Sequence, residues 1–161
     1  MTVRKNQATA LRRITLAIDT SEPSVKALEF VRTKFQPDQL NSNGGRAPSH
    51  VIVLHVIKRQ PLAPFTVRYT APWIKSEKKV KDVARKLINR AVQQLITAGF
   101  TAEPICKVGD PAEEIMNVAS KRNADLIVMG AKGLGKIDRI LLGSVSTRVV
   151  QYATCPVLVV R

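Results

Sequence analysis

The sequence predicts an α/β fold: a single-domain, open, mostly parallel five-stranded sheet with helices on both faces. Five apolar segments alternate with four amphipathic ones. Four of the apolar segments are dense in Val, Ile and Leu with little alternation, as expected for strands that are covered on both sides. Such alternation favours parallel strands joined by right-handed helical crossovers. A length of 161 residues fits one domain, residues 1–161, with a substantial core.

The expected strands are short apolar runs. They are Arg13–Asp19, His50–Ile57, Thr101–Val108, Ala124–Met129 and Pro156–Val160. The third of these contains Pro104, which has no N–H for a strand ladder, and this predicts an edge position. His55 lies inside an apolar run and is expected to be a hydrogen-bonded core histidine, whereas His50 opens that strand and is expected to be exposed.

The expected helices each carry a start or stop signal. Ser21-Glu22-Pro23 begins the first, with Ser21 as the expected cap. The second runs from about Lys75 to Ala98, has apolar residues at helical spacing and is followed by Gly99. Asp110-Pro111-Ala112-Glu113 begins the third, because it joins an N-cap aspartate to a proline at the first helical position. The fourth opens at Ser144.

Three segments fit no regular element. Residues 1–12 form a polar N-terminal tail. Gln36–Ser49 is rich in Asn, Gly and Pro and is expected to be a surface loop. Residues 58–74 form an irregular basic loop with three prolines, and connections of that length are commonly lids, binding loops or disordered.

Composition sets limits on the compartment. Hydrophobic residues make up 45% of the chain, yet no apolar run reaches the roughly 20 residues that span a bilayer. The N-terminus lacks the apolar core of a signal peptide, so we expect a cytoplasmic protein without membrane insertion. Cys106 and Cys155 fall at apolar, strand-like positions and are expected to be buried free thiols.

The net charge of +14 is concentrated in two stretches. Residues 1–15 carry four basic and no acidic side chains, and residues 58–90 carry ten basic against two acidic ones. The rest of the chain is nearly balanced. A basic surface of this kind can have a partner of its own, separate from any site elsewhere.

A spaced glycine motif is the strongest functional signal. Gly130 and Gly133 follow the apolar run Asp125–Met129, and Gly143-Ser144 opens a helix. Glycines allow a ligand close to the main chain, and the free N–H groups at a helix start suit a phosphate. A plain surface turn is the alternative. The run is neither a Gly-Lys-Ser/Thr phosphate loop nor a dinucleotide fingerprint, and the chain lacks the residue pairings of hydrolases.

This motif resembles the G-2x-G-9x-G-[S/T] signature of ATP-binding universal stress proteins. Ile14–Asp19 and Thr154–Arg161 are similar to the first and last strands of that family, so the resemblance covers the chain from about Arg13 onward. It implies the universal stress protein fold, which is adenine nucleotide alpha hydrolase-like. It also implies ATP, with Mg or Mn, as the ligand, and a regulatory role in the stress response.

The resemblance also assigns residues to a nucleotide site. Ala17 and Val56 would line the adenine pocket, and Asp19 would contact the nucleotide. From its chemistry alone, Asp19 could accept from a ribose hydroxyl, hold a divalent ion through water, or cap the first helix. The remaining nucleotide-binding positions would lie beside the ribose and phosphates: Met129, Gly130, Gly133, Gly143, Ser144, Val145 and Ser146. Lys132, Lys136 and Arg139 lie in or near the loop but are expected to be solvated.

We therefore expect an ATP-binding regulatory module, with no dedicated catalytic residue and at most slow ATPase activity. A homodimer through the terminal strand Val157–Val160 is expected, because an unpaired sheet edge invites pairing and the family usually dimerises this way. The main alternative is a basic interaction protein that docks on nucleic acid or an anionic partner through residues 58–90, which we rank second. A flavin or other nucleotide carrier on a similar fold is a third.

Overall fold

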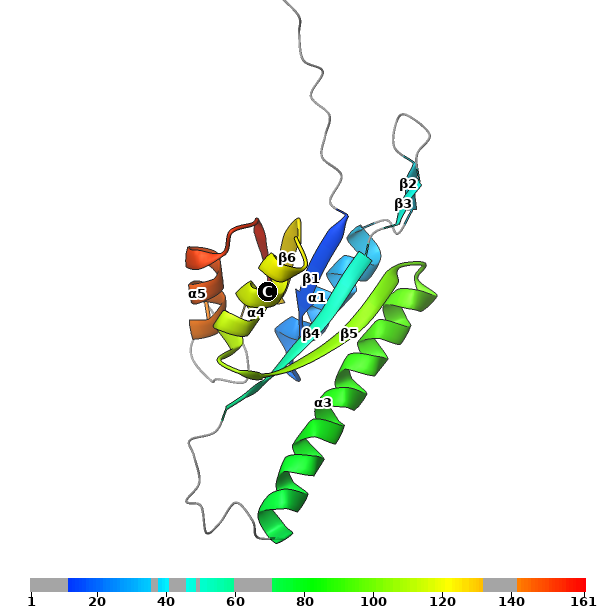
Figure 1. Cartoon of the computed structure of the whole chain (residues 1–161). Coiled ribbons are helices and arrows are strands. Elements are labelled where there is room, and N and C mark those ends of the chain that lie inside the picture. Colours follow the sequence, from blue (N-terminus) through cyan, green and yellow to red (C-terminus); the bar gives the residue numbers. More distant parts are fainter. Residues whose placement is uncertain (1–11, 36–37, 41–45, 49, 60–70, 132–141) are drawn as a thin grey trace, which may run out of the picture.

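The computed structural model describes residues 12–35, 38–40, 46–48, 50–59, 71–131 and 142–161. A five-stranded sheet of order β5-β4-β1-β6-β7 forms its centre, and all neighbouring strands in it are parallel (Figure 1). The strands are β1 (Arg13–Ala17), β4 (His50–Lys58), β5 (Thr101–Gly109), β6 (Leu126–Gly130) and β7 (Val157–Val160). All five predicted strands are confirmed, and β5 lies at an edge as Pro104 predicts.

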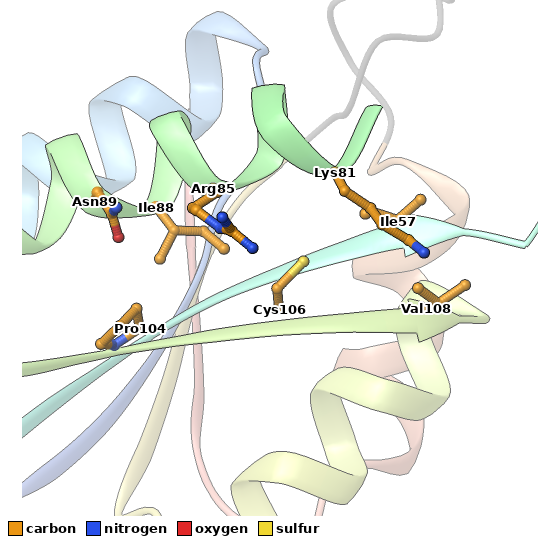
Figure 2. Close-up of a pocket in the computed structure, with 8 residues that line it drawn as sticks. All are labelled: Ile57, Lys81, Arg85, Ile88, Asn89, Pro104, Cys106 and Val108. Carbon is orange, nitrogen blue, oxygen red and sulfur yellow. The ribbon is translucent and has the colours of Figure 1, made fainter. Parts of the chain in front are cut away.

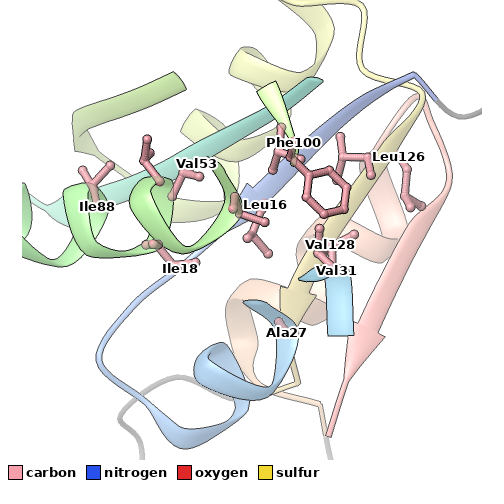
Figure 3. Packing of buried hydrophobic residues seen from close by; sticks show 14 residues of the cluster. Leu16, Ile18, Ala27, Val31, Val53, Ile88, Phe100, Leu126 and Val128 are labelled. Carbon is pink, nitrogen blue, oxygen red and sulfur yellow. The ribbon is translucent and has the colours of Figure 1, made fainter. Parts of the chain in front are cut away.

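Helices cover both faces of the sheet, as predicted. Side chains of α1 (Glu22–Lys34) and α3 (Ala71–Thr97) pack with one face, in a cluster that includes Leu16, Val53 and Val128 (Figure 3). Side chains of α4 (Pro111–Lys121) and α5 (Ser144–Tyr152) pack with the other face. Successive strand residues point to opposite sides, so a run of apolar residues serves both clusters at once. In the part of the chain that the structure describes, no helix is long and apolar enough to cross a membrane.

One polar side chain lies inside this core. Thr15 on β1 is fully buried, and its hydroxyl has no hydrogen-bond partner among the described residues. A buried hydroxyl without a partner loses its bond to water and gains nothing in return. Thr15 is therefore a local source of instability in the centre of the sheet.

The helix-end contacts follow the sequence signals at Asp110 and Gly99 but not at Ser21. The Asp110 carboxylate accepts the backbone N–H of Glu113 at 3.0 Å, and Gly99 takes a φ of 92° just after α3. Both are as predicted. Ser21 does occupy the position before α1, but its hydroxyl donates to Asp19 Oδ1 and makes no capping hydrogen bond. The prediction that Ser21 caps this helix is therefore wrong.

The expected loops contain more regular structure than predicted. Within Gln36–Ser49, β2 (Asp38–Leu40) pairs antiparallel with β3 (Arg46–Pro48). The Asn-Gly sequence between them is a strong hairpin signal that the loop interpretation overlooked. The irregular segment 58–74 is shorter than expected, because Lys58 belongs to β4 and α3 begins at Ala71. Pro72 is compatible with this, since proline is tolerated in a first helical turn. Residues 60–70 and the tail 1–11 lie outside the described residues.

Burial in the structure differs from the expectation at Cys106, Cys155 and His50. Cys106 is exposed rather than buried, because it lies on edge strand β5, and Cys155 is only half-buried. His50 is half-buried and its Nε2 lies 3.4 Å from Glu103 Oε1, so it is not the exposed residue expected. His55 is half-buried and its Nδ1 bonds to the carbonyl of Ile18 at 2.7 Å, which agrees with a hydrogen-bonded structural histidine.

Candidate functional site

The strand order of the sheet reverses between β1 and β6. The chain runs from β1 outward through β4 to β5, and then returns to the other side of β1 to form β6. In open parallel sheets, ligands bind beyond the carboxyl ends of the strands where the order reverses in this way. Asp19 follows β1 and Gly130 ends β6, so these two residues flank the reversal point.

The loop after β1 is held by its own hydrogen bonds. Asp19 Oδ1 accepts the backbone N–H of Ser21 at 2.9 Å and also the Ser21 hydroxyl. The backbone N–H of Asp19 donates to Ser24 Oγ at 2.8 Å. Asp19 is half-buried at this edge. Its carboxylate is thereby held in place, and one of its two oxygens is already used by Ser21.

Gly130 allows the start of α1 to touch the end of β6. A Cβ placed on Gly130 would lie 2.7 Å from the carbonyl carbon of Pro23 and 2.8 Å from the nitrogen of Ser24. Both atoms belong to the backbone, so neither can move aside independently. This glycine therefore has a structural role at the reversal point.

The start of α5 is fastened to the end of β6. The N–H of Gly143 donates to the carbonyl of Ala131 at 2.8 Å, and the buried Ser146 hydroxyl donates to the same carbonyl at 2.7 Å and to that of Gly143 at 3.0 Å. Ala131 in turn donates its N–H to Val160 in β7 at 2.7 Å. These bonds join the two ends of the glycine loop and set the helix start beside the strand edge.

The first turn of α5 has no side-chain cap. Gly143 is the N-cap residue, and the first N–H to return to its carbonyl is that of Thr147, at 2.9 Å. The N–H groups of Ser144, Val145 and Ser146 precede that bond, and such groups have no partner inside a helix. The start of α4 differs, because Asp110 caps it. The open turn of α5 can therefore bind an anion through backbone N–H groups and the helix dipole.

Three of the predicted residues are held by the strand register. Ala17 pairs with Leu54 on one side and with Met129 on the other, and Ala17 and Met129 are both buried. The N–H of Ile18 donates to the carbonyl of Leu54 at 2.8 Å, which carries the pairing one residue further. Val56 is half-buried near the end of β4. These residues thus line the carboxyl edge mainly with backbone and short apolar surface.

The structure brings most of the predicted positions that it describes to one edge of the sheet. Gly133, Lys132, Lys136 and Arg139 lie outside the described residues. The Ser146 hydroxyl is engaged inside the protein, so its backbone N–H is the group that could serve a ligand. Within the described ranges, no group of three or more His, Cys, Asp or Glu side chains could hold a metal ion alone.

A charged cluster beside the site was missed by the sequence analysis. Arg148 on α5 donates through Nη1 to both carboxylate oxygens of Asp110, at 3.0 and 2.9 Å, and its Nη2 lies 3.4 Å from Glu113. The pKa of Asp110 is lowered, first because it accepts the Glu113 N–H and also because it pairs with Arg148. The pKa of Arg148 is raised by the same partner. Asp110 therefore caps α4 and also ties α4 to α5.

Comparison with known proteins identifies the family of this chain. A sequence model of the Universal stress protein family matches residues 10–161, almost the whole chain. The chain belongs to the universal stress protein family. It is 31% identical over 156 residues to Universal stress protein YxiE of Bacillus subtilis, an alignment that covers 92% of this chain and 98% of that protein.

Solved structures of other universal stress proteins share the fold. The structure of protein MJ0577 of Methanocaldococcus jannaschii matches with a TM-score of 0.74 and 29% identity, over 93% of this chain and 95% of that one. A universal stress protein crystallised in complex with cAMP matches with a TM-score of 0.64 and 25% identity, over 93% and 97% of the two chains. That protein holds an adenine nucleotide on the fold that this universal stress protein shares.

Proposed function

We propose that this universal stress protein binds an adenine nucleotide, chiefly ATP, at the carboxyl edge between β1 and β6, and acts as a nucleotide-dependent regulatory module in the stress response. The open N-terminal turn of α5 carries this proposal. Its first three N–H groups, which have no partner inside the helix, lie beside the end of β6, because Gly143 and Ser146 both bond to Ala131. Backbone donors held in this way favour a phosphate chain over an uncharged ligand.

The rest of the proposed site follows from the same edge. The adenine would lie against Ala17 and Val56, the ribose beside Asp19 and Met129, and the phosphates at Gly130, Gly133 and the α5 start. The cAMP-bound relative supports the choice of adenine. The second Asp19 oxygen, which has no hydrogen bond to any described residue, suits a Mg or Mn ion held through water together with the phosphates, since Mg usually takes only one or two carboxylates and completes its shell with water.

The same proposal places this protein in the cytoplasm. We also expect at most slow hydrolysis of ATP. The proposed site holds a triphosphate without supplying an evident base for the attacking water. Docking on nucleic acid through residues 58–90 ranks second. The described cations of α3 are exposed, which supports weak, salt-sensitive association with polyanions.

Analysis of the ligand that copurifies with the protein tests this proposal. Heat or acid extraction followed by chromatography should release an adenine nucleotide from the wild type. Gly143→Val should release none while its circular dichroism stays that of the wild type, because the branched side chain would occupy space at the helix start. Release of a flavin, or equal nucleotide content in Gly143→Val, would contradict the proposal.

A further inference from the structure

A groove lies between α3 and the edge of the sheet. Its volume is about 460 Å³, within the range of small-molecule sites, which runs from roughly 300 to 1,000 Å³. Apolar side chains of three elements form much of its lining: Ile57 from β4, Ile88 from α3, and Pro104 and Val108 from β5. Figure 2 shows Lys81 and Arg85 reaching from the helix toward the strands, with Cys106 pointing back toward the helix.

The groove exists because α3 covers only part of edge strand β5. From Ala84 onward the sheet-facing residues of α3 are buried, but residues 76–83 are all exposed. Pro104, Cys106 and Val108 alternate along β5 and therefore share one face, and all three are exposed, Val108 at 49%. These exposed apolar side chains beside the helix can contact the apolar part of a ligand.

The two charged side chains that line the groove, Lys81 and Arg85, are both positive. Neither Lys81 nor Arg85 makes an ion pair or a hydrogen bond with any described residue. They lie four residues apart on one helix, where like charges reduce helix stability. Both lie close enough to Cys106 to act on its thiol: desolvation raises the pKa of Cys106, and the charges of Arg85 and then Lys81 oppose that shift. One anionic group between the two cations would relieve their repulsion.

We propose that this groove binds an amphipathic anion, a medium-chain carboxylate or a compound of the same chemistry. Its apolar chain lies along Ile57, Ile88 and Val108, and its head group lies between Lys81 and Arg85. A polyanion such as nucleic acid fits less well, because it would use the solvent-facing Lys79 and Lys86 equally and would leave the apolar floor uncovered. The groove shares no lining residue with the proposed nucleotide site.

Binding of hexanoate, octanoate and decanoate to the wild-type protein, followed by NMR or calorimetry, tests the chain part of the proposal. Affinity should rise with chain length, by about two- to fourfold per methylene, because each added group leaves water. Decyltrimethylammonium, which has the same chain and a positive head, should bind at least tenfold more weakly than decanoate. Equal binding of the two amphiphiles, or affinity that does not change with chain length, would overturn the proposal.

Matched charge variants test the head-group part. Lys81→Gln/Arg85→Gln should weaken decanoate binding by about tenfold or more, as expected for loss of two charge-assisted contacts. Lys79→Gln/Lys86→Gln removes the same charge from residues of α3 that do not line the groove, and it should change affinity less than twofold. ATP affinity should be unchanged in both pairs. Equal weakening by the two pairs would show only general attraction to a basic helix and would overturn the proposal.

Cys106 gives an independent readout of occupancy. Saturating decanoate should slow alkylation of Cys106 severalfold and leave that of the half-buried Cys155 unchanged. Equal alkylation rates of Cys106 with and without saturating decanoate would overturn the proposal. Protection by oligoglutamate or a single-stranded oligonucleotide, but not by decanoate, would assign the groove to an acidic macromolecule instead.

Discussion

Replacing Gly130 by alanine should destabilise the protein through one contact between main chains. The new Cβ would lie 2.7 Å from the Pro23 carbonyl carbon, 2.8 Å from the Ser24 nitrogen and 2.9 Å from the Pro23 Cβ. Real Cβ atoms do not approach other heavy atoms within 3.0 Å, so either the start of α1 or the end of β6 must move. Overpacking of this kind costs about 1–3 kcal/mol, and we expect the upper end because backbone must shift.

Gly109→Ala is the matched control for Gly130→Ala. Its Cβ would approach Glu114 equally closely, at 2.9 Å from Cγ, but Glu114 is a flexible side chain that can swing away. We therefore expect a cost below about 1 kcal/mol for Gly109→Ala. A loss of about 3 kcal/mol in Gly130→Ala corresponds to a melting temperature lowered by roughly 6–12 °C in a domain of this size.

Urea and thermal unfolding of the three proteins, followed by circular dichroism, measure the difference. ATP affinity should also fall in Gly130→Ala, because the displaced helix start carries the loop that holds Asp19. The reasoning would be refuted by a Gly130→Ala protein within about 0.5 kcal/mol of the wild type. It would be refuted equally if both alanine variants lost the same stability.

Three further predictions concern the core, the α4–α5 contact and the sheet edge. Thr15→Val should raise stability by about 1 kcal/mol in urea unfolding, because a buried hydroxyl without a described partner is removed; a loss would disprove this reason. Asp110→Asn should cost about 0.5–1 kcal/mol at pH 7, since it removes the partly exposed pair with Arg148. The lowered pKa of Asp110 means that its stabilisation is present above the ordinary carboxyl pKa and is lost as the pH falls through the folded value. The two proteins should therefore converge in acid, and a constant difference would count against the pairing. Val159→Pro should turn the expected homodimer into a folded monomer, as measured by light scattering. The carbonyls of Pro156 and Val160 accept hydrogen bonds from the β6 side, so by alternation the N–H of Val159 points to the free edge, and proline removes it. A monomeric wild type at tens of micromolar would contradict the dimer.

The features that could be predicted from the sequence are those set by local patterns. Runs of Val, Ile and Leu at Ile14–Ile18 and Val51–Leu54 identify buried strands, because each residue is covered whichever face it points to. Asp110-Pro111 and Gly99 mark helix ends for reasons that involve only neighbouring residues. These patterns predicted the five strands, their parallel arrangement and the edge position of β5.

The features that could not be predicted depend on contacts between distant residues. Nothing near Gly130 in the sequence indicates that Pro23 and Ser24 lie against it, and nothing near Ser146 indicates that its hydroxyl bonds to Ala131. The sequence does not distinguish Arg148 from other surface cations, because its contact with Asp110 depends on the fold. Cys106 was expected to be buried because its neighbours are apolar, whereas its exposure depends on how far α3 covers β5.

Calorimetric titration of nucleotide-free protein with ATP and magnesium tests the central claim most directly. The account predicts saturable binding of one ATP per chain in the wild type, and loss of that binding in Gly143→Val at unchanged circular dichroism. The absence of measurable binding at millimolar ATP, or the same affinity in both proteins, would contradict the claim that the open start of α5 is a phosphate site.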